Sequence, residues 1–308
     1  MGKILVAGEL NVDLVMSGLP HSPILGRELI GTGFQQVLGS SSAITAARLS
    51  MLGADVDFYG LVGGDDFGVF VLRQLADFGV HTGHIQTVDT PTGVTIALTY
   101  SQDRALLTYP GTIDQYAGQD LTSDVLRPYT HLHVGSFFLQ TSLQPKLACI
   151  FEQARALGLT TSLDIGWDPT ETWFDNPYLA PTLAHTDYFL PNEDEVTALA
   201  GGDYMPQRVA VHVAGALIVK RGSRGAAAYQ ANGEEIASVP SLPVTVIDTT
   251  GAGDAFNAGF IYATKILNHA LPEALRFAAA CGAQAVTQLG GATNAPAAES
   301  IFALLNQV

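Results

Sequence analysis

The sequence is poor in cysteine and in positive charge. Its 308 residues include 2 cysteines, Cys149 and Cys281, and both lie in Ala- and Leu-rich stretches of helical composition, where a thiol usually only packs. A disulfide framework is therefore excluded, and a reducing compartment fits best. With 29 acidic against 14 basic residues, the formal net charge is −15, which argues against a nucleic-acid or anionic-membrane partner.

Sequence features that define several other protein classes are missing. No apolar stretch approaches the roughly 18 residues of a membrane span, and the first residues resemble a strand more than a signal peptide. We therefore expect a cytoplasmic protein without a membrane partner. GxxxxGK[ST] does not occur, which excludes a P-loop enzyme, and GxGxxG does not follow the first predicted strand, as a nicotinamide-binding Rossmann domain would require. His131 and His133 lack further ligand residues at zinc-binding spacing.

What is present is an alternation of strand and helix patterns. Hydrophobic residues make up 47% of the chain and charged residues 14%, so a large core can form. Apolar strand-like runs alternate with helical patterns, which is typical of βαβ units and a parallel sheet. The strands are predicted at residues 4–8, 56–62, 131–135, 160–165, 188–190 and 216–220. The helices predicted at 43–52, 67–78 and 143–157 are each followed by a glycine.

Two regions, residues 29–38 and 94–109, lack a helical period. They alternate polar and apolar residues as half-exposed antiparallel strands do, and the second pair would turn around residues 101–103. We predict a small sheet that projects over the large domain; an irregular edge of the main sheet is the alternative. After Asp254 the chain is helical and rich in alanine without a linker, so residues 1–308 are predicted to form a single α/β domain.

The most informative segment is DTTGAGDAFNAGF, residues 248–260. It follows a β-prone run at 244–247, which predicts a strand, a tight turn and a helix N-terminus. The N–H groups of Gly251, Ala252 and Gly253 would converge where unpaired helix-start donors and the helix dipole favour an anion. Asp254 would stand beside that anion and accept a proton from a hydroxyl that attacks bound phosphorus. The alternative is an ordinary turn whose acid only complements the dipole.

Asn11 and Asp13 follow the first predicted strand. Because they are two residues apart in an extended segment, their side chains share one face. A carboxylate accepts hydrogen bonds from two vicinal hydroxyls, and an amide both donates and accepts, so the pair suits a polyol. A solvent-exposed strand end is the alternative.

With GELNVD at residues 8–13 and DTTGAGD late in the chain, the sequence resembles the ribokinase-like, or phosphofructokinase-B-type, family of carbohydrate kinases over nearly its full length. The resemblance implies a Rossmann-like, mostly parallel sheet flanked by helices, with a small antiparallel β lid from about residues 14–38 and 92–112. It implies ATP and Mg²⁺ as cofactors and Asp254 as the catalytic base. The amides of Gly251, Ala252 and Gly253 would form the anion hole for the transferring phosphate, and Asp13 would bind the sugar.

Two further segments resemble the nucleotide site of the family. In PNEDE, Asn192 and Glu195 match residues that support the nucleotide phosphates and Mg²⁺, partly through water; a helix-start acid is the alternative for Glu195. VKRGSRGA, residues 219–226, resembles a strand and turn next to the nucleotide, for which a plain hairpin turn is the alternative. Its matching positions are Lys220, Gly222, Ser223 and Gly225.

Asp248 and Thr250 resemble positions that in many relatives hold a monovalent cation, K⁺, together with carbonyls of a GG turn at residues 290–291. Local turn capping explains both residues equally well. Lid strands in this family often mediate dimers, so the resemblance leaves a homodimer through the lid open.

The acceptor side departs from the family pattern. Relatives commonly show a Gly-Gly pair followed four residues on by a sugar-contacting Asn, whereas this chain has Gly39, Ser40 and, at the Asn position, Ile44. Gly39 and the Ser40 hydroxyl remain candidates for substrate contact, but Ile44 cannot bond a hydroxyl, so ribose is not assigned. Arg104 would pair with an acceptor that carries a phosphate or carboxylate, or be a solvated hairpin arginine. Asp164, at the end of the strand predicted at residues 160–165, is a further candidate for lining the cleft.

The sequence thus predicts an ATP-dependent kinase that transfers the γ-phosphate to a hydroxyl of a sugar or sugar-like alcohol. A nucleoside or phosphosugar kinase of the same family is an alternative, and so is a sugar-binding sensor that kept the fold and lost turnover. Asp254 argues against the sensor, because a sensor has little need of a general base. The expected partners are small molecules, namely the acceptor and ATP.

Overall fold

A nine-stranded sheet runs through the larger part of the computed structural model, which describes residues 2–100, 104–287 and 297–306. Neighbouring strands are parallel from β5 to β11, and the last two join antiparallel. The order across the sheet is β13 (Glu235–Val239), β12 (Ala226–Gln230), β11 (Ala216–Lys220), β10 (Tyr188–Phe189), β9 (Thr160–Leu163), β8 (Tyr129–Val134), β1 (Lys3–Gly8), β4 (Val56–Gly63) and β5 (His81–Val88).

Helices cover both faces of this sheet, because its strands bury side chains on both sides. In β1, Ile4 and Val6 point into one hydrophobic core, while Leu5 and Ala7 point into the other, as the two-residue period of a strand requires. The first core is covered by α1 (Ser41–Met51), α2 (Asp66–Asp77), α8 (Ala252–Lys265), α9 (Leu271–Ala285) and α10 (Ala298–Leu305). The second is covered by α3 (Ser123–Leu126), α4 (Gln144–Ala156), α5 (Leu179–Leu183), α6 (Glu193–Leu199) and α7 (Pro206–Ala210).

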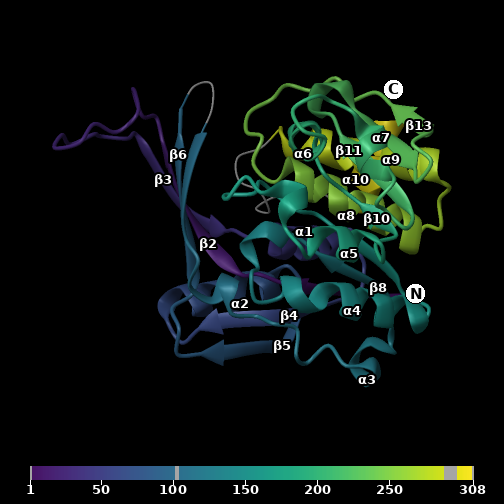
Figure 1. Ribbon diagram of the computed structural model, residues 1–308. Coiled ribbons are helices and arrows are strands. Elements are labelled where there is room, and N and C mark those ends of the chain that lie inside the picture. The colour runs from purple at the N-terminus through teal and green to yellow at the C-terminus, as the bar shows by residue number, and fades with distance from the viewer. Residues whose placement is uncertain (1, 101–103, 288–296, 307–308) are drawn as a thin grey trace.

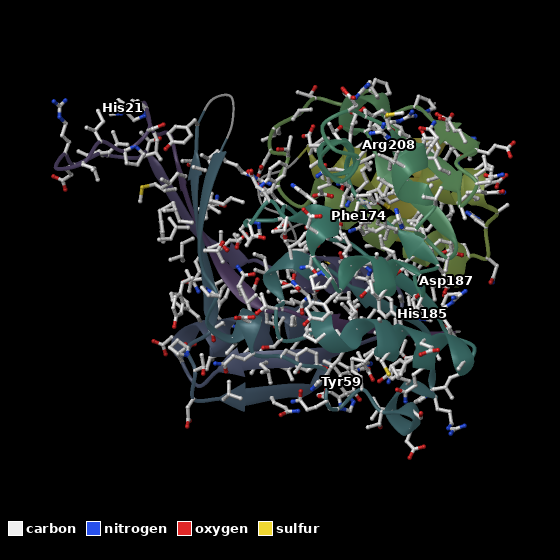
Figure 2. All side chains as sticks on the ribbon, viewed as in Figure 1. His21, Tyr59, Phe174, His185, Asp187 and Arg208 are labelled. Carbon is white, nitrogen blue, oxygen red and sulfur yellow. The ribbon has the colours of Figure 1, made fainter. Side chains whose placement is uncertain are left out.

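A second, four-stranded sheet stands apart from the first. Its order is β3 (Gly33–Leu38), β2 (Asn11–Ser17), β6 (Gly93–Thr99) and β7 (Arg104–Tyr109), and only the central β2–β6 pair is parallel. Figure 1 shows these strands rising on the left, away from helices α8 to α10. His21, labelled in Figure 2, lies near the outer end of this projection, in the segment between β2 and β3.

The mostly parallel sheet and the projecting sheet confirm the predicted fold class. The six predicted strands and three predicted helices are all present, with ends that differ from the prediction by at most two residues. Strands β5, β12 and β13 were not predicted. The turn predicted at residues 101–103 lies outside the described residues.

The strand predicted at residues 244–247 is wrong. This segment is irregular, and Val246 and Ile247 are 59% and 60% exposed. Pro240 and Pro243 precede it and offer no N–H to a ladder. Its described backbone contact runs to helix α9, since the Ile247 N–H donates to the carbonyl of Val286. The β-branched composition therefore did not produce a strand.

None of the helices in the described ranges combines the length and the apolar character that a membrane span requires.

Candidate functional site

Polar side chains gather at the carboxyl ends of the parallel strands. Glu9 follows β1, Asp164 follows β9, and Lys220 ends β11. The chain order along the sheet reverses between β1 and β8, and in an open α/β sheet ligands bind outside the carboxyl ends at such a point. The topology therefore places a binding site at this edge.

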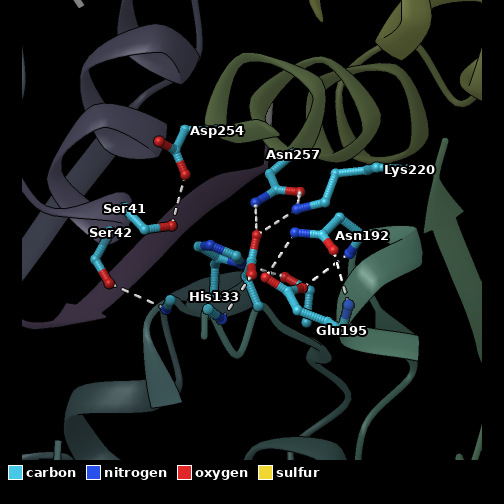
Figure 3. A network of polar contacts seen from close by, with 12 residues as sticks. Ser41, Ser42, His133, Asn192, Glu195, Lys220, Asp254 and Asn257 are labelled. Carbon is cyan, nitrogen blue, oxygen red and sulfur yellow. Dashed lines mark hydrogen bonds and ion pairs between the residues drawn. The ribbon is translucent and has the colours of Figure 1, made fainter. Parts of the chain in front are cut away.

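Asp254 lies at this edge, in the first turn of α8. Gly251 is the N-cap of that helix with φ 71°, a left-handed conformation that glycine adopts without strain. Ser41 Oγ, from the start of α1, donates a 2.6 Å hydrogen bond to Oδ1 of Asp254 (Figure 3). Removal from water and the nearby Asp164 carboxylate raise the pKa of Asp254 to about 7. Asp254 is therefore a carboxyl group that gains and loses its proton near neutral pH.

A buried ion pair occupies the centre of the site. Nζ of Lys220 lies 2.5 Å from Oδ2 of Asp164 and 3.2 Å from Oδ1 of Asn257, and Asn257 Nδ2 donates to the same Asp164 oxygen (Figure 3). Burial alone would lower the pKa of Lys220, but Asp164 and Glu195 outweigh it and raise that pKa. Burial alone would raise the pKa of Asp164, but Lys220 keeps it low. Both groups are therefore charged.

Glu195 and Asn192 form a reciprocal cap at the start of α6. Oε2 and Oε1 of Glu195 accept 2.8 Å hydrogen bonds from the backbone N–H and the Nδ2 of Asn192, and Asn192 Oδ1 accepts from the Glu195 N–H. Burial and the Asp164 charge raise the pKa of Glu195 to about 7. Glu195 therefore does act as a helix-start acid, which was the predicted alternative. Its carboxylate oxygens and the Asn192 amide oxygen are also of the type that Mg²⁺ prefers.

A cavity of 640 Å³ opens beside the N-terminus of α8. Gly225 shapes its wall, since with φ 86° any Cβ there would overlap the carbonyl of Val239. Ala252 and Gly253, two of the three predicted anion-hole residues, line the cavity. The predicted nucleotide-binding residues that line it are Lys220, Gly222, Ser223 and Gly225. Asn192 lies outside this cavity lining.

Asn11 and Asp13 lie together at the base of the projecting sheet. Asn11 Nδ2 donates to Oδ1 of Asp13 at 2.8 Å and to Oγ1 of Thr95 on the neighbouring strand at 3.2 Å. Removal from water raises the pKa of Asp13 to about 6, although Asn11 and Arg104 oppose the shift. A Cβ on Gly39 would overlap both side chains. The predicted acceptor residues Asn11, Asp13 and Gly39 are therefore in contact.

Ser40 is committed to other partners. Its hydroxyl lies within hydrogen-bond distance of the carbonyl and the carboxylate of Glu9, and it accepts from the N–H of Ala43 as the N-cap of α1. Ser40 has a positive φ of 71°, a backbone conformation that favours glycine, at the position where the family pattern has its second glycine. Ile44 is buried in the first hydrophobic core. The helix that would carry the sugar-contacting amide therefore presents an apolar side chain to the core.

Arg104 connects the projecting sheet with the glycine turn. Its guanidinium donates a 2.7 Å hydrogen bond to Oγ1 of Thr250. The N–H of Thr250 donates to Oδ1 of Asp248, which is the local turn capping given as the alternative to a cation site. Residues 290–291, whose carbonyls would complete that cation site, lie outside the described residues.

His131 and His133 share one face of β8, as the strand period predicts. His131 Nε2 and His133 Nδ1 lie 2.8 Å and 2.7 Å from the hydroxyl oxygen of Ser162. Burial lowers the pKa of His131, and it lowers the pKa of His133 to about 4 against the attraction of Asp164. Both rings are therefore neutral at physiological pH.

The sequence did not single out several residues that the structure brings to the site. Ser41 belongs to none of the motifs considered in the sequence, and Glu9 appears only as part of the GELNVD motif. Asn257 lies in the glycine-rich segment, three residues after Asp254, so helical spacing could have placed both side chains near one another. The partners of Glu9 and Ser41 come from distant segments, and no local pattern marks them.

The fold and the place of this site define an α/β protein with polar side chains gathered at the carboxyl ends of a mostly parallel sheet. More particularly, the chain belongs to the pfkB family of carbohydrate kinases, whose model matches residues 1–298. This confirms the family resemblance inferred from the two motifs.

Several curated relatives match over nearly the full chain. The ATP-dependent ribose-1-phosphate kinase of Halopiger xanaduensis is 31% identical, covering 100% of this chain and 99% of the relative. The ribokinase of Bacillus subtilis is 28% identical, covering 99% and 100%. A candidate ribokinase II from E. coli in complex with ATP and Mg²⁺ superposes with a TM-score of 0.85 at 27% identity, covering 100% of both chains.

Proposed function

We propose that this carbohydrate kinase transfers the γ-phosphate of ATP, with Mg²⁺, to a hydroxyl of a sugar. The observation that carries the proposal is the place of Asp254. The adjacent Ala252 and Gly253 line the large cavity, and Ser41, which bonds to Asp254, is two residues from Gly39, which packs on Asn11 and Asp13. The Asp254 carboxyl group thus lies between the cavity, which would hold ATP, and Asn11 and Asp13, which would hold the acceptor. The E. coli structure is described as a complex with ATP, and the Halopiger relative is named an ATP-dependent kinase.

The acceptor hydroxyl would be held by Asn11 and Asp13, with Asp254 as general base. Its oxygen would form a bond to the γ-phosphorus while the bond from that phosphorus to ADP breaks, and its proton would pass to Asp254. The N–H groups of Gly251 and Gly253 would face the negative charge of the transferring group. The N–H of Ala252 donates to the carbonyl of Thr249 at 3.3 Å and would join them by exchanging that partner for the phosphate. Lys220 would add a fixed positive charge on the same cavity wall.

Mg²⁺ would neutralise phosphate charge, and Glu195 would hold it, partly through water. Both Glu195 oxygens already accept from Asn192, but a carboxylate has about four lone-pair sites, so water can still bond to them. For Asp248 and Thr250 we retain a K⁺ role beside the turn capping seen in the structure. Rates in KCl and in NaCl at equal ionic strength test it, and equal rates would refute it.

A phosphosugar acceptor is the second candidate, and Arg104 favours it. The Arg104 charge is close enough to Asp13 to oppose the rise of its pKa, and its guanidinium reaches Thr250. An anionic acceptor held next to the Asp13 carboxyl group needs such a cation to offset the repulsion. The Halopiger relative is named for ribose 1-phosphate.

The projecting sheet would act as a lid over the acceptor, within a single domain of residues 1–308. A homodimer through this sheet is proposed from its exposed apolar side chains, since Phe34, Ile96 and Leu107 lie on one face of it and are 63%, 43% and 54% exposed. Such patches often mark protein interfaces. A cytoplasmic location is proposed from the cysteine usage of the sequence.

An ATP-consumption screen tests the function. Pentoses, hexoses, pentose 1-phosphates and nucleosides would be offered with MgATP, and the Asp254→Asn variant would be run in parallel. Transfer to a sugar or a sugar phosphate that is lost in the variant supports the proposal. A blank screen together with measurable sugar binding would favour a sensor instead.

A further inference from the structure

We propose that Ser41 is a positioning residue that holds Asp254 and directs one of its two carboxylate oxygens toward the acceptor. The inference rests on the proposed role of Asp254 as general base. Ser41 is the first residue of α1, and 213 positions separate it from Asp254, with which it shares the 2.6 Å hydrogen bond. Neither residue could be assigned to the other from local sequence.

The bond occupies one defined oxygen of the base. Ser41 Oγ donates to Oδ1 of Asp254, which leaves Oδ2 to receive the proton of an attacking hydroxyl. A carboxylate free to rotate would present its oxygens in many directions, whereas a general base must lie within hydrogen-bond reach of the proton it takes. The hydrogen bond to Oδ1 therefore restricts the carboxylate to one orientation, in which Oδ2 can accept the proton.

The start of α1 is itself firmly anchored, so Ser41 is a rigid donor. The buried carboxylate of Glu9 accepts from the Ser42 N–H at 3.1 Å, from Ser42 Oγ at 2.6 Å and from Gln140 Nε2 at 3.0 Å. Ser42 Oγ in turn accepts from the N–H of Gly135, at the end of β8. The serines on either side of Ser41 thus tie the helix start to β1 and β8, while Ser41 alone of the three bonds to Asp254 in the described part of the chain.

The hydroxyl also stabilises the ionised base. A hydrogen bond donated to a carboxylate favours its charged form, and Ser41 opposes the effects of burial and of Asp164 on the pKa of Asp254. The other charged groups that face Asp254 are Glu9 after β1, Arg48 on α1, Asp164 after β9 and Lys220 at the end of β11. Removing the Ser41 hydroxyl leaves all of these in place, so a change in titration would report the lost bond.

The test compares Ser41→Ala with the wild type in two measurements. The first is the pH profile of kcat for the acceptor found in the screen. The second needs no turnover: it follows the Asp254 carboxyl by carbon-13 NMR, with Asp254→Asn to assign the signal. We expect Ser41→Ala to move both midpoints to higher pH by about one unit, because a hydrogen bond to a charged group is worth roughly that much, and to lower kcat about tenfold at pH 6.

Two further variants separate positioning from packing. Ser41→Thr keeps a donor and should show the wild-type midpoints. Ser41→Cys is similar in size to the wild type but a weak donor, so it should show the same shift as Ser41→Ala. It replaces the alanine variant in the test if that variant folds poorly. Ser50→Ala, at the other end of α1, is the matched control and should leave both midpoints unchanged. If the hydrogen bond serves only to hold α1 against α8, Ser41→Ala will lower the melting temperature and leave both midpoints unchanged. That result overturns the proposal.

The two levels of inference fail in different ways. An Asp254→Asn variant with wild-type rates would refute the base and thus the proposed function. An inactive Asp254→Asn together with unshifted midpoints in Ser41→Ala would refute only the role of Ser41.

Discussion

Nζ of Lys220 lies 2.5 Å from Oδ2 of Asp164, and both side chains are nearly buried, with 12% and 7% of their surface exposed. Strands β9 and β11, which position the pair, are separated in the sheet by β10 alone. Each charge is therefore stable in its place only because the other is there.

Lys220→Met should destabilise the protein strongly. It leaves the Asp164 carboxylate buried without its cation, which typically costs about 3–5 kcal/mol. Urea unfolding at pH 7.5 measures the loss. The Asp164→Asn/Lys220→Met double variant should recover most of it, because no uncompensated charge remains. If the double variant is as unstable as the single one, the loss of stability comes from the methionine and not from the unpaired Asp164 charge.

Asp254→Asn should abolish transfer while nucleotide still binds, with a loss in kcat of about a hundred- to ten-thousand-fold. In the wild type kcat should rise with pH through about 7, the pKa of Asp254, because only the ionised carboxyl accepts a proton. Steady-state rates from pH 5.5 to 9 and calorimetric titration with nucleotide check both statements. A flat profile would exclude Asp254 as the titrating base.

The same variant should be more stable than the wild type in alkaline solution. The pKa of Asp254 is about 7 in the folded protein and about 3.9 in an unfolded chain. A raised folded pKa contributes stability that is complete below the unfolded value and is lost as pH rises through the folded one. The advantage of the Asp254→Asn variant over the wild type should therefore grow between about pH 4 and pH 7 and then level off, and melting temperatures across this range measure it.

The sequence was sufficient where the determinants are local. Apolar runs placed β1 and β4, and the glycine turn placed the helix start that carries Asp254. It was insufficient at residues 244–247, because β-branched composition says nothing of the prolines that precede a segment or of the helix on which it packs. It also could not pair Ser41 with Asp254, since that contact depends on the order of strands across the sheet.

Gly39→Ala should impair the acceptor site selectively. The new Cβ would overlap Asn11 and Asp13, and overpacking of this kind costs about 1–3 kcal/mol. If this free energy is lost from acceptor binding, the KM for the acceptor should rise about tenfold or more, and the nucleotide Kd should stay unchanged. Gly83→Ala is the control, because a Cβ on Gly83 meets open space. Equal effects of the two changes would show that Gly39 does not shape the acceptor site.

Removal of Mg²⁺ with EDTA should stop the reaction, and added Mg²⁺ should restore it. Glu195→Gln should require about ten- to a hundredfold more Mg²⁺ for half-maximal rate, the usual loss when a group that supports a metal is changed. Glutamine can still complete the cap with Asn192, so the melting temperature should change little. An unaltered Mg²⁺ requirement would assign Glu195 to the helix cap alone.

Strand β2 continues from β1 after only Glu9 and Leu10, yet it belongs to the other sheet. Asn11 and Asp13 thus sit on one framework, whereas Asp254 and the cavity sit on another. In the proposed reaction, the angle between the two sheets would set the distance between the acceptor and the nucleotide. A tilt of the smaller sheet would move an acceptor held by Asn11 and Asp13 along with it, so the two residues between β1 and β2 would control how the reactants are oriented.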